Sequence, residues 1–370
     1  MCDSIMEAIS VALAKEYLKE FGTILHYNID KGLLAAGRVR KRFGGGEVLK
    51  PMELIIGDRA TFKASGKKIP VADLAIDAAK RWIRGNMRFV DPESHLKYRF
   101  ILAPGSGELV DIFQRPGKVR GANDTSAAVG YYPLSPTEKI VLELERHLNS
   151  KRFKEKYPET GEDIKVMGLR RINVLELTVA MPLLAGYIAS EKEYFERKER
   201  IYQEMVQFLE KLEGFEQKIV HFNTLDEKGR GLGGVYLSLL GTSAEDADSG
   251  QVGCGNRVNG LISMNRPMGT EAAAGKNPVS HVGKIYNVLA HKIAMEIYQK
   301  IEGIKEVYVL LLSRIGAPVD KPQMVIAQVL LEKGRRFSGI PGAVNDIIEI
   351  EFADINKFCM DLSAGRYSVC

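Results

Sequence analysis

The segment from residue 271 to residue 287, E-A-A-A-G-K-N-P-V-S-H-V-G-K-I-Y-N, combines a flexible turn, several cations and the start of a helix. A Gly-Lys pair ending at Lys276 precedes the helix, where free backbone N–H groups and the helix dipole favour phosphate. His281 and Lys284 follow five and eight residues later, so both could face the same anion. We therefore expect this segment to grip a polyphosphate group.

The spacing is not that of a Walker A loop. Gly269 lies one residue too far from the Gly-Lys pair, and Asn277 replaces the hydroxyl that would contact Mg²⁺ in such a loop. A helix start with ordinary solvated lysines is the alternative interpretation of the same residues.

A second polar segment follows a predicted strand, with T-S-A-E-D-A-D-S-G at residues 242–250 and G-C-G-N-R at residues 253–257. Three acids, Glu245, Asp246 and Asp248, lie within four residues. A nucleotide–Mg²⁺ site needs oxygen ligands and open backbone N–H groups, and this loop supplies both. A polar surface loop built from turn residues would have the same composition.

Residues 161–170, G-E-D-I-K-V-M-G-L-R, place an acid and a base close together. In a strand, Asp163 and Lys165 would face the same side, where they could hold a ribose hydroxyl and a phosphate. They could equally form a surface ion pair worth less than about 1 kcal/mol. Two further turns, A-N-D-T-S at 122–126 and F-G-G-G-E at 43–47, are typical of loops, and the three glycines allow either close backbone approach or a flexible lid.

The composition limits the classes of function. Lys+Arg exceed Asp+Glu by 52 − 47 = 5, which suits a small anionic substrate but not nucleic acid, since no aromatic–basic cluster accompanies the charge. The four cysteines form no C-x-x-C pair, which indicates reduced thiols in a cytoplasmic protein. No apolar run reaches transmembrane length, so we expect no membrane partner.

Caps and apolar periodicity predict five helices that would position these segments. They begin near Ser4, Leu74, Ser135, Ser190 and Ile285. Strands are predicted at 33–36, 53–56, 98–102, 174–181, 218–222, 235–240, 307–312 and 325–331. Because strands often come in pairs between helices, we predict an α+β fold with mainly antiparallel sheets covered by helices.

Taken in order, these segments resemble the archaeal-type methionine adenosyltransferases, also called S-adenosylmethionine synthetases. The resemblance runs through H-Y-N-I-D-K (26–31), F-G-G-G-E-V (43–48), A-N-D-T-S (122–126), G-E-D-I-K-V-M-G-L-R (161–170), G-T-S-A-E (241–245), G-N-R-V-N-G-L-I (255–262), R-P-M (266–268) and the segment 271–287. It covers most of the chain from Cys2 to about Pro322, and little of it is visible after about Leu331.

The resemblance implies three similar α+β domains around a pseudo-threefold axis, which we place at residues 1–100, 101–233 and 234–370, with edges that can interleave. It implies a homodimer with active sites between subunits, ATP and methionine as substrates, and Mg²⁺ and K⁺ as cofactors. The sulfur of methionine would displace triphosphate from ATP, and the triphosphate would then be hydrolysed to diphosphate and phosphate. Such a reaction needs cations already in place around a highly charged leaving group.

The resemblance also assigns roles to individual residues. Catalytic roles at the triphosphate fall on Lys165, Lys276 and His281. Binding of nucleotide, methionine or phosphate falls on Asp124, Asp163, Asp248, Arg257 and Lys284. The resemblance gives no metal ligands within this sequence.

Two departures from the family pattern bear on activity. The family has a Gly-His-Pro-Asp segment before the equivalent of Cys2-Asp3, and this sequence begins after it, so we expect its histidine and acid to be absent. Cys254 stands where the family pattern G-R-G-N-R has its first arginine, a triphosphate contact, and Arg257 could partly substitute. Two hypotheses follow: an enzyme that makes S-adenosylmethionine, or an impaired paralogue that binds ATP or triphosphate without making it.

Overall fold

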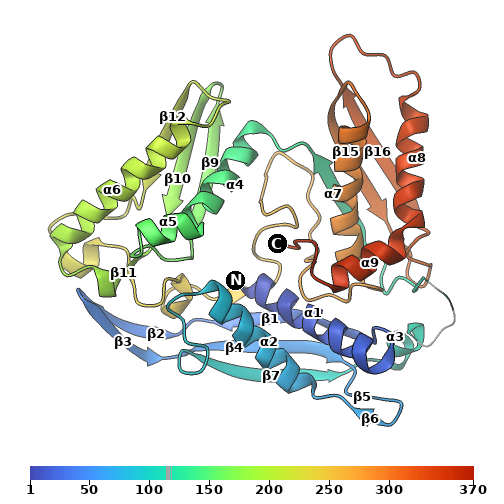
Figure 1. Cartoon of the computed structure of the whole chain (residues 1–370), viewed down its shortest axis with the longest axis horizontal. Coiled ribbons are helices and arrows are strands. Elements are labelled where there is room, and N and C mark those ends of the chain that lie inside the picture. The colour runs from blue at the N-terminus through green and yellow to red at the C-terminus, as the bar shows by residue number, and fades with distance from the viewer. Residues whose placement is uncertain (114–116, 118) are drawn as a thin grey trace.

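The computed structural model describes residues 1–113, 117 and 119–370, and its architecture is mixed α/β with small sheets. The three largest sheets, each with helices packed on it, surround a central region in which both termini lie (Figure 1). Most strand pairs are antiparallel, as predicted. Within the described ranges, no helix has both the length and the apolar character needed to cross a lipid bilayer.

The first sheet has the strand order β14-β1-β4-β7. Its elements, with the helices beside it, are α1 (Cys2–Phe21), β1 (Tyr27–Ala35), β4 (Met52–Ala60), α2 (Val71–Asn86), β7 (Leu96–Pro104) and β14 (Gly250–Gln251). Ile5, Ile9 and Leu13 of α1 are fully buried in the same core as Ile29 of β1 and Leu54 of β4. β4 and β7 run parallel because α2 forms the crossover between them.

The second sheet has the order β12-β10-β9 and its own core. Its elements are α4 (Pro136–Leu148), α5 (Lys151–Lys156), β9 (Lys165–Arg171), β10 (Val174–Ala180), α6 (Glu191–Glu210) and β12 (Gln217–Phe222). Here α6 is the crossover that makes β10 and β12 parallel, so the second sheet repeats the helix–strand–strand–helix–strand order of the first.

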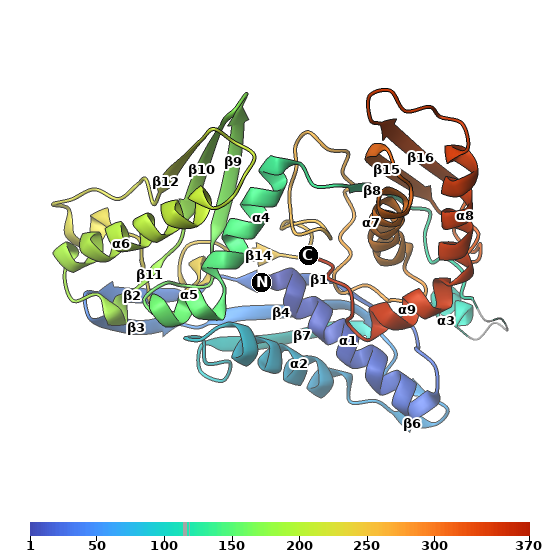
Figure 2. The same cartoon turned by 45° about the horizontal axis from the view of Figure 1, so that its top comes forward.

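The third sheet is antiparallel, with the order β16-β15-β8. Its elements are β8 (Ala127–Tyr132), α7 (Val282–Lys300), β15 (Ile304–Leu312), β16 (Met324–Leu331), α8 (Ile340–Ala353) and α9 (Ile355–Ser363). Helix α7 lies so close to β8 that a Cβ on Gly130 would meet the backbone nitrogen of His291 at 2.1 Å, so only glycine fits there. Figure 2 shows the loop between β14 and α7 running through the central region between α4 and α7.

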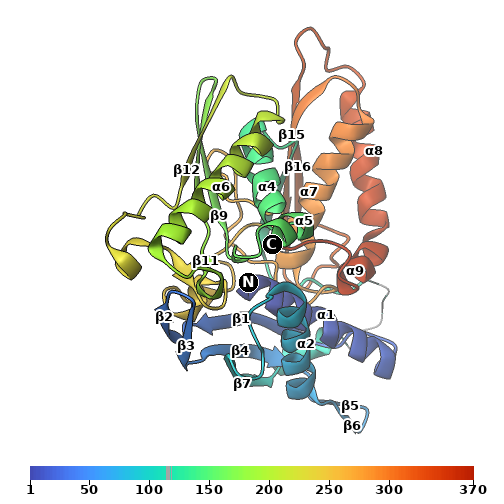
Figure 3. The same cartoon turned by 60° about the vertical axis from the view of Figure 1, so that its left-hand side comes forward.

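A hairpin of β2 (Arg38–Arg42) and β3 (Gly45–Lys50) joins the first sheet to the second (Figure 3). At its tip, the backbone nitrogen of Gly44 donates to the carbonyls of Ala185 at 3.1 Å and Ile188 at 2.7 Å. A Cβ on Gly46 would meet a side-chain carbon of Leu239 at 2.7 Å. Close approach, the first of the two interpretations of that turn, therefore holds for Gly46, whereas a Cβ on Gly44 or Gly45 would meet no atom within 4 Å.

The remaining elements are short. They are β5 (Lys63–Ala64), β6 (Lys67–Lys68), α3 (Gly107–Ile112), β11 (Leu183–Leu184), β13 (Leu237–Ser238), β14 above, and the 3₁₀ turns Ala185–Tyr187, Gly231–Gly234 and Ser243–Glu245.

The predicted helices are all present, with differences at their ends. The capping box at Ser135 is confirmed, and Ser190 caps α6 as predicted. The box at Ser4 is wrong, because α1 already begins at Cys2 and has no side-chain cap. The division into 1–100, 101–233 and 234–370 stays a prediction, although β8 joins the third sheet and β14 joins the first.

Candidate active site

The segment 271–287 turns sharply before α7 and is attached to β1. Gly275 adopts a φ of 79°, and a Cβ there would meet the carbonyl oxygen of Ile29 at 2.5 Å. The backbone nitrogen of Ile29 donates to the carbonyl of Gly275 at 3.0 Å. The Gly-Lys pair is thus fixed by the edge of the first sheet rather than by the helix alone.

Lys276 is a buried cation, with 3% of its surface exposed. Its Nζ lies 2.9 Å from Glu271 Oε1 and 3.3 Å from Asp30 Oδ2. Although burial opposes it, the hydrogen bond from Ser126 and the charge of Lys276 lower the pKa of Glu271. The alternative of an ordinary solvated lysine is therefore wrong for Lys276.

His281 caps the N-terminus of α7. Its Nδ1 accepts a hydrogen bond from the backbone nitrogen of Gly283 at 3.2 Å, so the other ring nitrogen can carry a proton. Burial, followed by the charge of Lys276, lowers the pKa of His281 to about 3. The ring is therefore neutral at physiological pH and can donate a hydrogen bond to an anion without adding charge.

Lys284 points elsewhere than Lys276. Its Nζ lies 2.8 Å and 2.7 Å from the two carboxylate oxygens of Glu7 in α1 and 3.1 Å from Ser10 Oγ, and the residue is fully buried. Burial lowers the pKa of Lys284 and raises that of Glu7, and each charge opposes the shift of the other. Glu7 also accepts from the backbone nitrogen of Gly275 at 3.0 Å, so the pair holds the turn on which Lys276 sits.

The A-N-D-T-S turn lies against this segment. Ser126 donates to Glu271, and Asn123 Oδ1 accepts from the first residue of α7, Val282, at 3.3 Å. Asp124 is exposed at the same turn, with one carboxylate oxygen 2.7 Å from the backbone nitrogen of Thr125. Asp124 is thereby brought beside the segment 271–287, while its carboxylate faces solvent.

Asp163 and Lys165 contact the acidic loop, although Asp163 precedes β9 rather than lying in it. Asp163 Oδ2 accepts from the backbone and hydroxyl of Ser243 at 2.9 Å and 2.5 Å. Lys165 Nζ lies 3.6 Å from Asp248 Oδ2, and both side chains are about two-thirds exposed (69% and 66%). These three residues form a second group, which shares no hydrogen bond or ion pair with Lys276 or His281 among the described residues.

The three acids of the 242–250 loop do three different things. Glu245 is 1% exposed and accepts from the backbone nitrogens of Leu239 and Leu240, so it holds the loop's own backbone. Asp246 pairs with Lys41 of β2 at 2.8 Å. Of the three, only Asp248 remains a candidate for substrate.

Arg257 lies in a pocket also lined by Asp3, Glu271 and His291. Its Nη1 donates to the carbonyl of Gly253 at 3.2 Å, while its Nε is buried and has no protein partner among the described residues. Cys254, in the same loop, is exposed, and all four cysteines of the chain are unpaired.

Comparison with known proteins decides the family. Residues 1–366 match the model described as S-adenosylmethionine synthetase (AdoMet synthetase). The chain belongs to the S-adenosylmethionine synthetase family. The match to residue 366 corrects the expectation that the resemblance fades after about Leu331.

Relatives in this family are similar along most of their length. The chain is 45% identical over 371 residues to an S-adenosylmethionine synthase of Pyrococcus furiosus, covering 100% of this chain and 92% of the relative. It is 46% identical over 339 residues to a probable S-adenosylmethionine synthase of Aquifex aeolicus, covering 90% and 83%. An unusual S-adenosylmethionine synthetase from Campylobacter jejuni has the same fold, with a TM-score of 0.61 at 14% identity, covering 98% and 90% of the two chains.

The sequence did not predict Asp30 and Glu271, the two carboxylates beside Lys276, as site residues. Glu271 opens the segment 271–287, and Asp30 is the fifth residue of the quoted H-Y-N-I-D-K motif, so both lay within recognised segments. What the sequence did not indicate is that β1 and the turn before α7 are neighbours, which brings both carboxylates to the same ammonium.

Proposed function

We propose that this chain is a methionine adenosyltransferase that converts ATP, methionine and water to S-adenosylmethionine, phosphate and diphosphate. The observation that carries the proposal is the buried Lys276, fixed between Glu271 and Asp30 in a chain of this family. A cation held in position before the substrate arrives stabilises a leaving triphosphate without reorganisation cost at the moment of reaction.

The other candidate residues would bind the triphosphate, the nucleotide or methionine. Lys276 and Lys165 would contact the triphosphate, and His281 would donate a hydrogen bond from its neutral ring. Asp163 and Asp248 would bind the nucleotide, Asp124 would lie near methionine and adenosine, and Arg257 would reach the triphosphate through its unpaired Nε. Lys284 would act indirectly, through Glu7 and the Gly275 turn.

Mg²⁺ and K⁺ belong to the proposal as cofactors. No group of three or more His, Cys, Asp or Glu side chains in the described ranges could hold a metal ion. Mg²⁺ is often held by substrate phosphates and one or two carboxylates, and Asp30 with Asp58 would suit that arrangement. Burial and the neighbouring Asp30 raise the pKa of Asp58 to about 6, and Asn28 Oδ1 is buried without a partner, so a cation would relieve both.

A homodimer with active sites between subunits would unite the two groups of candidate residues that share no contact in one chain. Exposed apolar side chains on strands of all three sheets support such an interface. They are Ile101 (55% exposed), Met167 (65%), Leu169 (46%), Ile326 (43%) and Leu330 (37%).

We further propose three similar domains around a pseudo-threefold axis, supported by the repeated helix–strand–strand–helix order along the chain. The unpaired cysteines support a reducing, cytoplasmic location. The small charge excess supports neither a nucleic-acid nor a membrane partner.

The test incubates the purified chain with ATP, methionine, Mg²⁺ and K⁺ and measures S-adenosylmethionine and phosphate separately. We expect both products, and we expect Lys276→Met to abolish them. Lys151→Met is the matched control, because Lys151 has a 91% exposed side chain on α5. Bound ATP with neither product from the wild-type chain would instead support the impaired-paralogue hypothesis.

Cys254→Arg separates the two half-reactions. If Cys254 weakens triphosphate hydrolysis, the wild-type chain will release S-adenosylmethionine faster than phosphate, and Cys254→Arg will restore equal rates. Unequal rates that persist in Cys254→Arg would remove this position from the hydrolytic step.

A further inference from the structure

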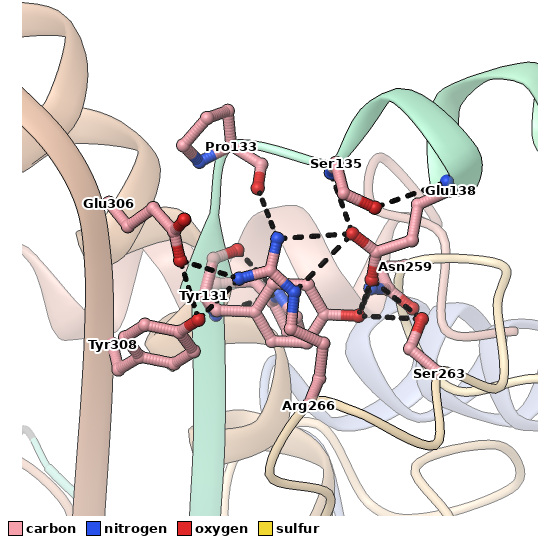
Figure 4. Close-up of polar contacts among 10 residues, drawn as sticks. Tyr131, Pro133, Ser135, Glu138, Asn259, Ser263, Arg266, Glu306 and Tyr308 are labelled. Carbon is pink, nitrogen blue, oxygen red and sulfur yellow. Dashed lines mark hydrogen bonds and ion pairs between the residues drawn. The ribbon is translucent and has the colours of Figure 1, made fainter. Parts of the chain in front are cut away.

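A buried charged cluster lies beside the loop that carries Arg257 (Figure 4). At its centre is Arg266, whose side chain is 5% exposed. The side chains bonded to Arg266, or to its carboxylate partner Glu138, are Tyr131, Glu138, Ser263, Glu306 and Tyr308. Asn259 joins them through the Tyr131 hydroxyl, and we call these six residues with Arg266 the Arg266 cluster. Arg266 does not line the pocket that contains Arg257, and its side chain is surrounded by protein, so it is not placed to contact a substrate directly.

Every N–H donor of the Arg266 guanidinium has a protein partner. Nη2 and Nε donate to Glu138 Oε2 at 3.1 Å and 3.4 Å, and Nη2 also donates to the carbonyl of Pro133 at 3.1 Å. Nη1 donates to Glu306 Oε2 at 3.1 Å and to the Tyr308 hydroxyl. The guanidinium carbon lies 4.6 Å from the centre of the Tyr131 ring. Only a planar guanidinium offers this fork, so lysine cannot replace it contact for contact.

Glu138 is held as firmly. Its Oε1 accepts from Ser263 Oγ at 2.6 Å and from the Tyr131 hydroxyl at 2.9 Å, and its Oε2 accepts from the backbone nitrogen of Ser135 at 2.7 Å. Although burial opposes it, these hydrogen bonds and Arg266 lower the pKa of Glu138 to about 2. The Glu138–Arg266 pair is therefore ionised at every physiological pH.

The cluster joins the Arg257 loop to three other parts of the fold. Arg266, Ser263 and Asn259 all come from the loop between β14 and α7, and Asn259 Nδ2 donates to the Tyr131 hydroxyl at 2.9 Å. Their partners lie on β8, at the start of α4 and on β15. These side chains fix the loop from one side, as Figure 4 shows.

Arg257 depends on that anchorage. Its backbone is bonded only within the loop among the described residues, donating to Leu261 at 2.9 Å and accepting from Gly260 at 2.8 Å. Within the described ranges, the side chain of Arg257 makes one hydrogen bond, to Gly253 of the same loop, whose backbone nitrogen donates to Asp3 of α1 at 2.8 Å. The position of its guanidinium relative to Glu271 and α7 is thus set by the contacts that hold the loop as a whole.

We propose that Arg266 is a positioning residue, whose bonds to Glu138 and Glu306 hold the 253–268 loop so that Arg257 reaches the triphosphate. The effect on triphosphate binding rests on the proposed function. The immobilisation of the loop by Arg266 does not. The two can therefore be measured separately.

Cys254 supplies a reporter inside the loop. It is exposed, whereas Cys2 and Cys359 are buried, so a thiol-specific spin label will report on the loop once Cys370→Ser removes the remaining partly exposed thiol. In the full chain we expect Arg266→Lys to increase the mobility of the label. In unlabelled protein we expect inorganic tripolyphosphate to bind at least about tenfold more weakly, because small displacements of a binding group cost that much or more.

Arg197→Lys is the matched control. Arg197 lies on α6 between two carboxylates, 3.3 Å from Glu159 and 2.7 Å from Glu193, and none of the three belongs to the 253–268 loop. It should lower thermal stability and leave the label's mobility unchanged. Ser263→Ala, which removes one hydrogen bond to Glu138, should shift mobility and affinity in the direction of Arg266→Lys by a smaller amount, and it serves if Arg266→Lys fails to fold.

An unchanged label in both Arg266→Lys and Ser263→Ala would overturn the proposal, as would equal mobilisation in Arg197→Lys. A mobilised label with unchanged tripolyphosphate affinity would overturn the link from the loop to Arg257. If the wild-type chain does not bind tripolyphosphate at all while Arg266→Lys still mobilises the label, the proposed function fails and the positioning of the loop stands.

Discussion

Replacing Lys284 with methionine removes one partner of a buried ion pair and keeps most of the side chain's volume. Lys284 and Glu7 have side chains that are 1% and 13% exposed, with 2.7 Å between their charged atoms. Removing one partner of such a pair leaves the other charge buried without compensation, which typically costs about 3–5 kcal/mol. For a chain of 370 residues the unfolding entropy makes 1 kcal/mol worth roughly 1.3 °C, so Lys284→Met should lower the melting temperature by about 4–6 °C.

The loss of stability in Lys284→Met should depend on pH, and the pKa of Glu7 determines whether it grows or shrinks as pH rises. Burial already raises the pKa of Glu7, and removal of Lys284 takes away the opposing charge and raises it further. The folded variant then binds a proton that the unfolded chain has released, so its stability falls as pH rises above the unfolded-state pKa. The deficit of Lys284→Met relative to the wild type should therefore shrink as pH is lowered through the unfolded-state pKa of Glu7, 4.5, because below it Glu7 is protonated in both states.

The double variant Glu7→Gln with Lys284→Met is the control that isolates the charge. It removes both charges but keeps an oxygen that can accept from the backbone nitrogen of Gly275, the contact that Glu7 makes at 3.0 Å. Replacing both members of a buried pair by neutral groups is often close to neutral in stability, so we expect most of the lost melting temperature to return.

Thermal unfolding and tripolyphosphate calorimetry on the same samples decide the role of Lys284. Destabilisation that the double variant repairs would confirm that Lys284 acts through Glu7. A Lys284→Met chain that melts as the wild type does but binds tripolyphosphate at least about tenfold more weakly would refute this reasoning, since Lys284 would then be a direct phosphate ligand.

Three further predictions concern the same region. Lys276→Met removes a charge-assisted contact worth about 1.5–3 kcal/mol and should weaken tripolyphosphate binding by roughly 10- to 150-fold in calorimetry, with Lys151→Met unchanged. His281→Ala should cost about 1 kcal/mol in urea unfolding and His281→Asn much less, since asparagine can also cap a helix; equal losses would contradict the capping role. The pKa of Asp58 is raised from its ordinary value of 3.8 to about 6 in the folded chain. Between about pH 4 and 6 the folded chain therefore binds a proton that the unfolded chain has released, and the contribution of Asp58 to stability falls as pH rises. Asp58→Asn should remove that slope from melting temperatures measured across the range, and an unaltered slope would contradict the assignment to Asp58.

The parts of the fold that local signals determine could be predicted from the sequence. Ser135 and Ser190 cap helices because their hydroxyls bond backbone nitrogens three residues ahead, a contact that neighbouring residues alone decide. The turn at Gly275 followed from the same kind of reasoning, whereas the burial of Lys276 did not, because it depends on Asp30 of β1. The strand β8 was missed, since its Gly130 weakens the strand pattern and is explained only by the close approach of α7.

The orientation of charged side chains could not be predicted, because it depends on partners far away in the chain. Spacing alone allowed Lys284 to face the same anion as His281, but its partner Glu7 is 277 residues away and pulls it into the core. In the same way, Glu245 looked like a metal ligand among three acids, whereas free backbone nitrogens at Leu239 and Leu240 turn it inward.

The charges around Lys276 also bear on how an anion can bind there. Lys276 contacts Asp30 and Glu271, and Asp30 is shared with Lys31 at 2.6 Å and lies close to Asp58. Two cations therefore face three carboxyl groups, so the surroundings of Lys276 are not strongly positive in spite of its charge. A triphosphate brings further negative charge to the same place, and in a partly buried site that repulsion is poorly screened. The arrangement thus favours a triphosphate that arrives with divalent cations over the bare anion, as the proposed function requires.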